Sequence, residues 1–129
     1  MMKLKYCIVS ANANAGYYEF VPIVCDIWKK LLDIEVIVIY IGHILPSELK
    51  QYESNIKMFE PIPNIHTAFQ AQCIRLLYPS LLNTEDGVLV ADIDMFPVRT
   101  EYYDGLNNID DKHFIITQIF NKRKLAIAK

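Results

Sequence analysis

The sequence is poor in the features that mark several common classes of protein. Its 129 residues include 4 glycines and 3 cysteines, and the formal net charge is −2. It contains neither the GxGxxG pattern that binds dinucleotides nor the GxxxxGK[ST] pattern that binds nucleotide phosphates. Lysine and arginine cluster only at 122–124, whereas a protein that binds nucleic acid by neutralising phosphates is usually basic. These absences argue against a dinucleotide or P-loop site and against a nucleic-acid partner.

Long apolar runs and paired cysteines are also missing. No apolar run reaches the roughly 18 residues that a membrane-spanning helix needs. Lys3 and Lys5 precede only a short apolar run, so the N-terminus does not read as a signal peptide. Cys7, Cys25 and Cys73 lie far apart inside apolar stretches, which favours buried, reduced thiols over a metal or redox role. We therefore expect a cytoplasmic chain without a membrane span.

What is present is enough apolar sequence for a folded domain. Hydrophobic residues make up 53% of the chain and charged residues 22%, a balance that excludes a disordered polypeptide. The length suits one domain with a hydrophobic core. We therefore treat residues 1–129 as a single domain.

Apolar runs and helical periodicities alternate along this domain. Strands are expected where short apolar, often β-branched runs stand between turn residues, at 6–10, 35–41, 57–59, 88–91 and 113–119. Helices are expected where apolar residues recur at helical spacing, at 20–31, at 46–55 and from Asn64 or Thr67 to about Pro79. The alternation is typical of an α/β fold with a mostly parallel sheet flanked by helices.

The third of these helices combines an N-terminal signal with an apolar stripe. Thr67 and Gln70 have the spacing of a capping box. Phe69, Cys73 and Leu76 recur at helical spacing and form its apolar stripe, the side on which an amphipathic helix normally packs.

The most informative segment is the acidic end of the fourth expected strand. Asp92 and Asp94 leave a buried strand with Ile93 between them, so strand geometry would point both carboxylates to one side. Oxygen ligands suit Mg²⁺ or Mn²⁺, which keep waters or substrate phosphates as further ligands. Two like charges this close also require a cation or a hydrogen-bond donor nearby. A metal site and an ordinary acidic turn are the two interpretations.

Polar residues follow the first expected strand at the same edge of the sheet. Ligands of parallel α/β sheets bind beyond the carboxyl ends of the strands. Three loops gather there, at 10–16, 42–45 and 92–97. Ser10, Asn12 and Asn14 offer hydrogen-bonding groups, and Tyr17 and Tyr18 suit stacking on a base. The alternative is a plain loop whose polar residues cap the next helix.

Arg75 lies on the third expected helix, before the strand that ends at Asp92. Its guanidinium is suited to pair with Asp92 or to contact a phosphate or sugar. The alternative is an arginine that extends from the helix edge into solvent.

Three segments, in order, resemble the nucleotide-sugar-binding half of a GT-A-fold glycosyltransferase. They are the opening strand with its small polar loop, the arginine-containing helix and the hydrophobic strand that runs into Asp-x-Asp, at 7–12, 70–79 and 87–97. The resemblance implies a Rossmann-like core. It also implies metal-dependent transfer of a sugar from a UDP- or GDP-linked donor to an acceptor, either a glycan or another molecule.

The same resemblance implies roles for individual residues. Asp92 and Asp94 would hold the Mn²⁺ or Mg²⁺ that bridges the diphosphate. The donor would contact Ser10, Ala11, Asn12, Tyr17, Arg75, Asp92 and Ile93. The catalytic residue is left unassigned, and the remaining polar groups that follow the motif are Asp110, Asp111 and His113.

The chain is short for a complete enzyme of this kind. Only 35 residues follow Asp94 in the 129-residue chain, whereas family members carry a further stretch that builds the acceptor site. We expect a donor-binding portion truncated on its acceptor side, or part of a homo-oligomer. A non-catalytic nucleotide or nucleotide-sugar binding module is the alternative. A phosphatase of the haloacid-dehalogenase type fits less well, because Phe96 replaces the usual Thr or Val and the motif comes late in the chain.

Overall fold

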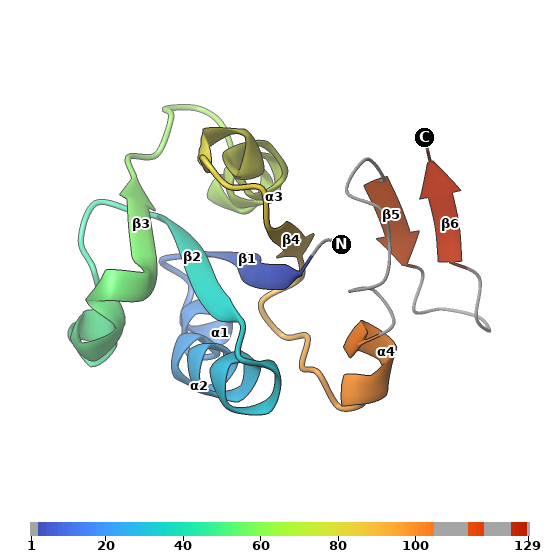
Figure 1. Cartoon of the computed structure of the whole chain (residues 1–129). Helices are drawn as coiled ribbons and strands as arrows, with labels where there is room; N and C mark the ends of the chain where they lie inside the picture. The colour runs from blue at the N-terminus through green and yellow to red at the C-terminus, as the bar shows by residue number, and fades with distance from the viewer. Residues whose placement is uncertain (1–2, 105–113, 118–124, 129) are drawn as a thin grey trace.

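The computed structural model describes residues 3–104, 114–117 and 125–128 (Figure 1). Its strands are β1 (Leu4–Asn12), β2 (Glu35–Ile41), β3 (Ile56–Phe59), β4 (Gly87–Val90), β5 (Phe114–Thr117) and β6 (Leu125–Ala128). Its α-helices are α1 (Ala15–Tyr18), α2 (Val21–Leu32), α3 (Thr67–Leu77) and α4 (Thr100–Asp104), and its 3₁₀ helices are η1 (Ser47–Asn55) and η2 (Tyr78–Leu81).

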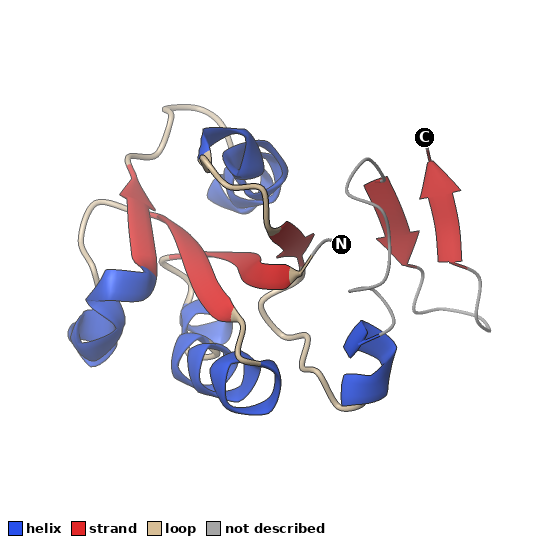
Figure 2. Cartoon of the chain, in the orientation of Figure 1, coloured by secondary structure: helices blue, strands red, loops and turns tan. Residues whose placement is uncertain are grey.

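Four of these strands form one sheet in the order β3-β2-β1-β4. Every neighbouring pair is parallel, and Ile8 of β1 lies between Ile37 of β2 and Val90 of β4. Helix α3 covers one face of the sheet, and α1 and α2 cover the other (Figures 1 and 2). The predicted α/β class, with a Rossmann-like parallel sheet between helices, is confirmed.

The centre of the sheet is buried on both faces. Cys7, Ile8 and Val9 of β1 are fully buried. Because side chains alternate along a strand, Cys7 and Val9 join the apolar cluster on the α2 side, whereas Ile8 joins the cluster under α3. This double burial explains why the β-branched runs of β1 and β2 are continuous rather than alternating.

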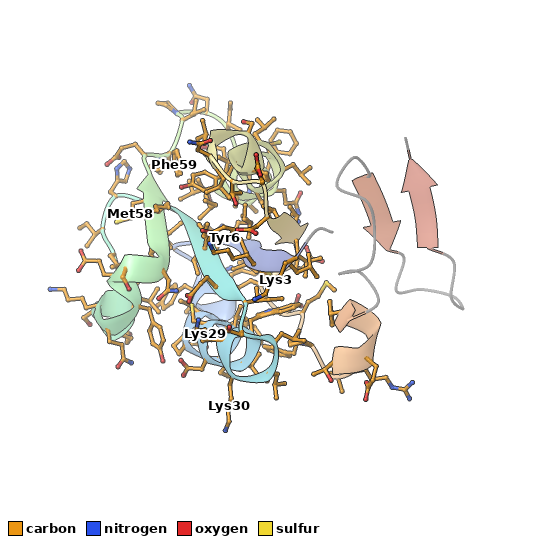
Figure 3. The ribbon with its side chains drawn as sticks, viewed as in Figure 1. Lys3, Tyr6, Lys29, Lys30, Met58 and Phe59 are labelled. Atoms are coloured by element: carbon orange, nitrogen blue, oxygen red, sulfur yellow. The ribbon has the colours of Figure 1, made fainter. Side chains whose placement is uncertain are left out.

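Helix α2 follows the amphipathic pattern that its sequence predicts. Pro22 occupies its first turn, and Asp33 ends it in the left-handed conformation, with φ 53°. Val24 and Trp28 are fully buried in the core. Lys30 extends away from the sheet (Figure 3), so the charged side of the helix faces solvent.

Helix α3 packs with a different face than its sequence predicts. Of the expected apolar stripe, Phe69 is 59% exposed, Leu76 is 64% exposed and Cys73 is only partly buried. The buried residues of α3 are Gln70 and Ala71, and Ala71 and Ile74 pack against the apolar cluster around Ile8 of the sheet. The apolar stripe is therefore mostly exposed, and Ile74, which lies outside it, makes the large apolar contact.

Helix α3 begins at Thr67, but its N-cap is neither Asn64 nor Thr67, the two caps that the sequence suggests. The N-cap is His66, whose Nδ1 accepts a hydrogen bond from the backbone N–H of Ala68 at 3.2 Å. Asn64 lies outside the helix in the left-handed conformation, with φ 67°. Gln70 does not close a capping box. Its side chain bonds the preceding loop, accepting from the N–H of Ile62 at 2.8 Å and donating to the carbonyl oxygens of Ile62 and Ile65 at 3.0 and 2.7 Å.

Smaller differences concern the lengths and types of elements. The first strand continues to Asn12, and the expected surface helix at 46–55 is the 3₁₀ helix η1. Helices α1 and α4 were not predicted. Phe59 at the end of β3 packs on the α3 side, with its ring centroid 6.2 Å from that of Tyr78 (Figure 3).

The last expected strand corresponds in part to β5, which pairs with β6 in a separate antiparallel pair. Strand β6 was not predicted. Asp110, Asp111 and His113 lie outside the described residues, so their sequence interpretation stays a prediction.

Candidate functional site

One pocket lies at the carboxyl edge of the parallel sheet, where the ends of β1 and β4 meet α3. It has a volume of about 270 Å³. Its walls are Ser10, Ala11, Asn12, Tyr17, Ala68, Ala71, Gln72, Arg75, Asp92, Ile93 and Asp94. All eight residues predicted for the donor and metal site line this pocket. The loop at 42–45, which was also expected near the site, does not.

The two aspartates lie in a turn that directly follows β4. The N–H of Ala91 donates to the carbonyl oxygen of Ile8 at 3.0 Å, which keeps this end of the chain beside β1. The N–H of Met95 then donates to the carbonyl oxygen of Asp92 at 3.1 Å and closes the turn. Ile93 is 5% exposed, whereas Asp92 and Asp94 are exposed. The carboxylates therefore border the same space, as predicted, but a turn rather than a continuing strand directs them there.

Arg75 joins α3 to this turn. Its Nη1 donates to the carbonyl oxygen of Ala91 at 3.0 Å and lies 2.8 Å from Oδ1 of Asp92. The arginine side chain is only 15% exposed, so the predicted pairing with Asp92 is confirmed and the alternative of an arginine extended into solvent was wrong. The pairing neutralises one carboxylate of the motif. Asp94 has no ion-pair partner within the part of the chain that the structure describes.

The arginine also carries an unused donor. Its Nε is buried and has no hydrogen-bond partner among the described residues. A buried N–H without a partner costs free energy unless a ligand or water satisfies it. The guanidinium is thus fixed through Nη1, whereas its Nε–H has no partner among the described residues.

Polar residues at the end of β1 form another part of the pocket wall. Ser10 and Asn12 are both buried. The Nδ2 of Asn12 donates to Oγ1 of Thr67 at 3.2 Å, and its Oδ1 accepts from the N–H of Asn14 at 3.0 Å. Asn14 in turn caps α1 through the N–H of Gly16 at 2.9 Å. Asn12 and Asn14 therefore order the local backbone, and the capping role that the sequence left open is realised at Asn14.

The two tyrosines after this loop have different environments. Tyr17 is 46% exposed and lines the pocket. Tyr18 packs against the core cluster on the α2 side instead. Of the two aromatic rings considered for stacking on a base, only Tyr17 lies at the pocket.

The sequence interpretation missed the part of the pocket that α3 supplies. Ala68, Ala71 and Gln72 line it together with Arg75. Ala71, Gln72 and Arg75 follow Ala68 by three, four and seven positions, which places all four residues on one face of the helix. The small side chains on the face that carries Arg75 were the signal that could have identified this wall, because small residues leave room for a ligand.

The carboxylates fit a cation that arrives with a ligand better than a cation held by protein alone. Among the described residues, no group of three or more His, Cys, Asp and Glu side chains gathers to hold a metal ion. Mg²⁺ and Mn²⁺ are commonly bound through one or two carboxylates plus substrate phosphates. Asp92 and Asp94 match that requirement in number and chemistry.

Fold and site together define a Rossmann-like α/β domain with an acidic pocket at the carboxyl edge of its sheet. Comparisons with protein-family models, curated proteins and solved structures found no match. No helix in the described ranges is both long enough and apolar enough to cross a bilayer.

Proposed function

We propose that this chain binds a UDP- or GDP-linked sugar through Mn²⁺ or Mg²⁺, as the donor-binding domain of a GT-A-fold glycosyltransferase. The observation that carries the proposal is the pocket itself. Asp92 and Asp94 border it just after β4, a partly buried strand at the edge of the parallel sheet, Arg75 pairs with the first of them, and the end of the neighbouring strand β1 also lines it.

The charges around the pocket explain why a divalent cation is needed. A diphosphate is strongly anionic, yet Arg75 is the only cationic residue among the described residues that line the pocket, and Asp92 already neutralises it. Two carboxylates would repel a bare diphosphate. A metal ion held by Asp92 and Asp94 would offset this repulsion, and it would supply positive charge that stabilises a leaving diphosphate when the glycosyl bond breaks.

The two aspartates would divide the work. Asp94, which lacks an ion-pair partner among the described residues, supplies the carboxylate with undiminished charge and is the main metal ligand. Asp92 is oriented by Arg75 and offers its second oxygen to the metal or to a donor hydroxyl. Ile93 between them is buried and anchors the turn against the core.

The remaining walls suit a nucleoside. Tyr17 offers a half-exposed ring for stacking, and Ser10 and the backbone of Ala11 lie at the end of β1. Ala68 and Ala71 keep the α3 wall low enough for a ligand to approach. Asn12 is occupied by Thr67 and Asn14, so its role is to hold these elements in place.

Calorimetry tests this function directly. We expect UDP or GDP to bind with Mn²⁺ or Mg²⁺ present and to lose at least about tenfold in affinity, ~1.4 kcal/mol, with EDTA or in Asp94→Ala. Glu53→Ala removes an exposed carboxylate of η1 outside the pocket and serves as the matched control. Equal affinity with EDTA, or unchanged affinity in Asp94→Ala, would contradict the metal bridge.

A non-catalytic nucleotide or nucleotide-sugar binding module is the second candidate. It is favoured by the pocket lining within the described ranges, in which Asp92 and Asp94 are the only carboxylates and both are assigned to the metal. Transfer that depends on an added acceptor distinguishes the two functions. A module would bind the donor with the same metal dependence and yet release no nucleotide when acceptors are supplied.

A further inference from the structure

The outward side of α3 is an apolar surface that nothing in the pocket uses. It consists of six large side chains from the loop before α3, from α3 itself and from η2: Ile62, Ile65, Phe69, Leu76, Leu77 and Leu81. Their exposed fractions lie between 43% and 70%. We call this set the α3 face. In Figure 1, α3 is the outermost layer on its side of the sheet, and none of the labelled elements, all from the described residues, lies over it.

The α3 face is larger than an ordinary surface patch. At half to two-thirds exposure, each Leu, Ile or Phe presents on the order of 100 Å², so six present roughly 600 to 700 Å² in total. The largest patch on a typical monomer is about 300 to 600 Å². Each partner in a standard stable interface buries about 800 Å². The apolar side chains alone therefore supply most of the area that one protomer of a dimer requires.

The loop that contributes to this face is held in place rather than loosely packed. The buried side chain of Gln70 makes three hydrogen bonds to the backbone of Ile62 and Ile65. These bonds fix the loop against α3 while the two isoleucine side chains remain exposed. A surface that is ordered before binding loses less conformational entropy when a partner docks.

Charge and spacing indicate what that partner is. From Pro61 to Thr84 the sequence contains one charged residue, Arg75, and its guanidinium is committed to the pocket side. A surface that binds an anionic membrane would carry Lys and Arg beside its apolar residues, whereas two uncharged copies of one face meet without repulsion. Phe69, Cys73 and Leu76 follow each other at intervals of four and three, the spacing of an interhelical seam.

We propose that the α3 face is a self-association surface, through which two copies of this chain form a two-fold symmetric dimer. In an isologous pair the two α3 helices run antiparallel. The small Cys73 lies midway between Phe69 and Leu76, so the two Cys73 side chains lie near the two-fold axis. The pocket occupies another side of α3, at Ala68, Ala71 and Arg75, and stays open in the dimer.

Light scattering and sedimentation of the full chain test the dimer. At about 100 µM, a concentration that populates any dimer with a lower dissociation constant, we expect a mass twice that of the 15.0 kDa monomer. Leu76→Glu places a charge on the seam and weakens the dimer at least about tenfold. Ile23→Glu is the matched control, because Ile23 is 53% exposed on α2 at the opposite face. Leu77→Gln is a milder second variant should Leu76→Glu fail to fold.

Cross-linking tests the arrangement of the two helices. A short bis-maleimide is expected to link two chains through Cys73, because Cys7 and Cys25 are buried, and Cys73→Ser abolishes the link. Three results would overturn the proposal: a dimer that does not cross-link through Cys73, a dimer that Leu76→Glu leaves intact, or a chain that stays monomeric. A monomeric chain overturns it whether or not the chain binds neutral lipid vesicles. Nucleotide affinity in Leu76→Glu is expected to equal that of the unaltered chain, so this test is independent of the proposed function.

Discussion

Helices α2 and α3 lie on opposite faces of one sheet and expose opposite kinds of surface. Helix α2 buries Val24 and Trp28 completely and turns its lysines outward. Helix α3 instead packs Ala71 and Ile74 against the sheet and leaves Phe69, Leu76 and Leu77 exposed. The difference shows that one helix is built to stabilise the domain, whereas the other is built to present a pocket on one side and an apolar surface on another.

The inward residues of α3 explain this arrangement. Gln70 holds the loop before the helix, Ala71 leaves space beside the sheet, and Arg75 reaches the end of β4. None of these contacts requires a large apolar side chain. The burial that stabilises the fold is therefore concentrated on the α2 side, where the larger of the two apolar clusters lies.

Truncation of a large side chain on each helix gives the largest expected difference. Trp28→Ala removes a fully buried side chain and is expected to lower the free energy of unfolding by about 3–5 kcal/mol. Leu77→Ala removes a side chain that is 68% exposed and is expected to change it by less than about 0.5 kcal/mol. Urea denaturation of dilute protein, where self-association does not contribute, measures both. Similar losses in the two variants would contradict the assignment of the core to the α2 side.

The sequence predicts the strands and α2 well, because their signals are local. Continuous β-branched runs mark β1 and β2, and the alternation of apolar and charged residues marks α2. The position of the candidate site residues at one edge of the sheet was also predictable, whereas their roles stay predictions. Asp92 and Asp94 follow the apolar run of β4, and parallel strand ends meet at one edge of a sheet.

The orientation of α3 was not predictable from its own sequence. Periodicity shows that Phe69, Cys73 and Leu76 share one side, but it does not show what that side faces. The outcome depends on bonds to distant segments: Gln70 to Ile62, and Arg75 to Ala91. The His66 cap was missed for a related reason, since histidine is not among the preferred capping residues.

Substitution of Gln70 also tests the comparison of α2 with α3, with an expected loss of stability between those of Trp28→Ala and Leu77→Ala. Gln70→Leu leaves the backbone groups of Ile62 and Ile65 without their buried partner, which is expected to cost about 1–3 kcal/mol. Gln72→Leu, at an exposed position of the same helix, is the control and is expected to be nearly neutral. Hydrogen exchange of the Ile62 amide should accelerate only in Gln70→Leu. Unchanged protection of that amide would show that the loop is held by other contacts.

Near neutral pH the cysteines have the smallest effect on stability, and their exposure shows the same contrast between the core and α3. Burial raises the pKa of the Cys7 thiol far above its usual range and raises the pKa of Cys25 to about 12. In the unfolded chain both thiols ionise near pH ~8.5. Above that pH the unfolded state binds fewer protons than the native state, so the free energy of unfolding falls as pH rises, by at most about 1.4 kcal/mol per pH unit for each thiol.

Urea denaturation between pH 7 and 10 measures this loss, at pH values chosen on both sides of the unfolded thiol pKa of about 8.5. Cys25→Ala should flatten the decline. At neutral pH, a thiol reagent should modify the partly exposed Cys73 of α3 and spare the two buried cysteines. Modification of Cys25 at the rate of Cys73 would contradict the tight packing of α2.

The most direct test of the central claim is binding of Mn²⁺ itself, followed by electron paramagnetic resonance. Because Asp92 and Asp94 are the only carboxylates that the described part of the chain places at the pocket, Mn²⁺ alone should bind weakly, and addition of UDP or GDP should tighten its binding at least about tenfold. Asp94→Asn should remove this gain, whereas Glu53→Gln should keep it. Equal Mn²⁺ binding with and without nucleotide, or a gain that survives Asp94→Asn, would contradict a metal-bridged diphosphate site.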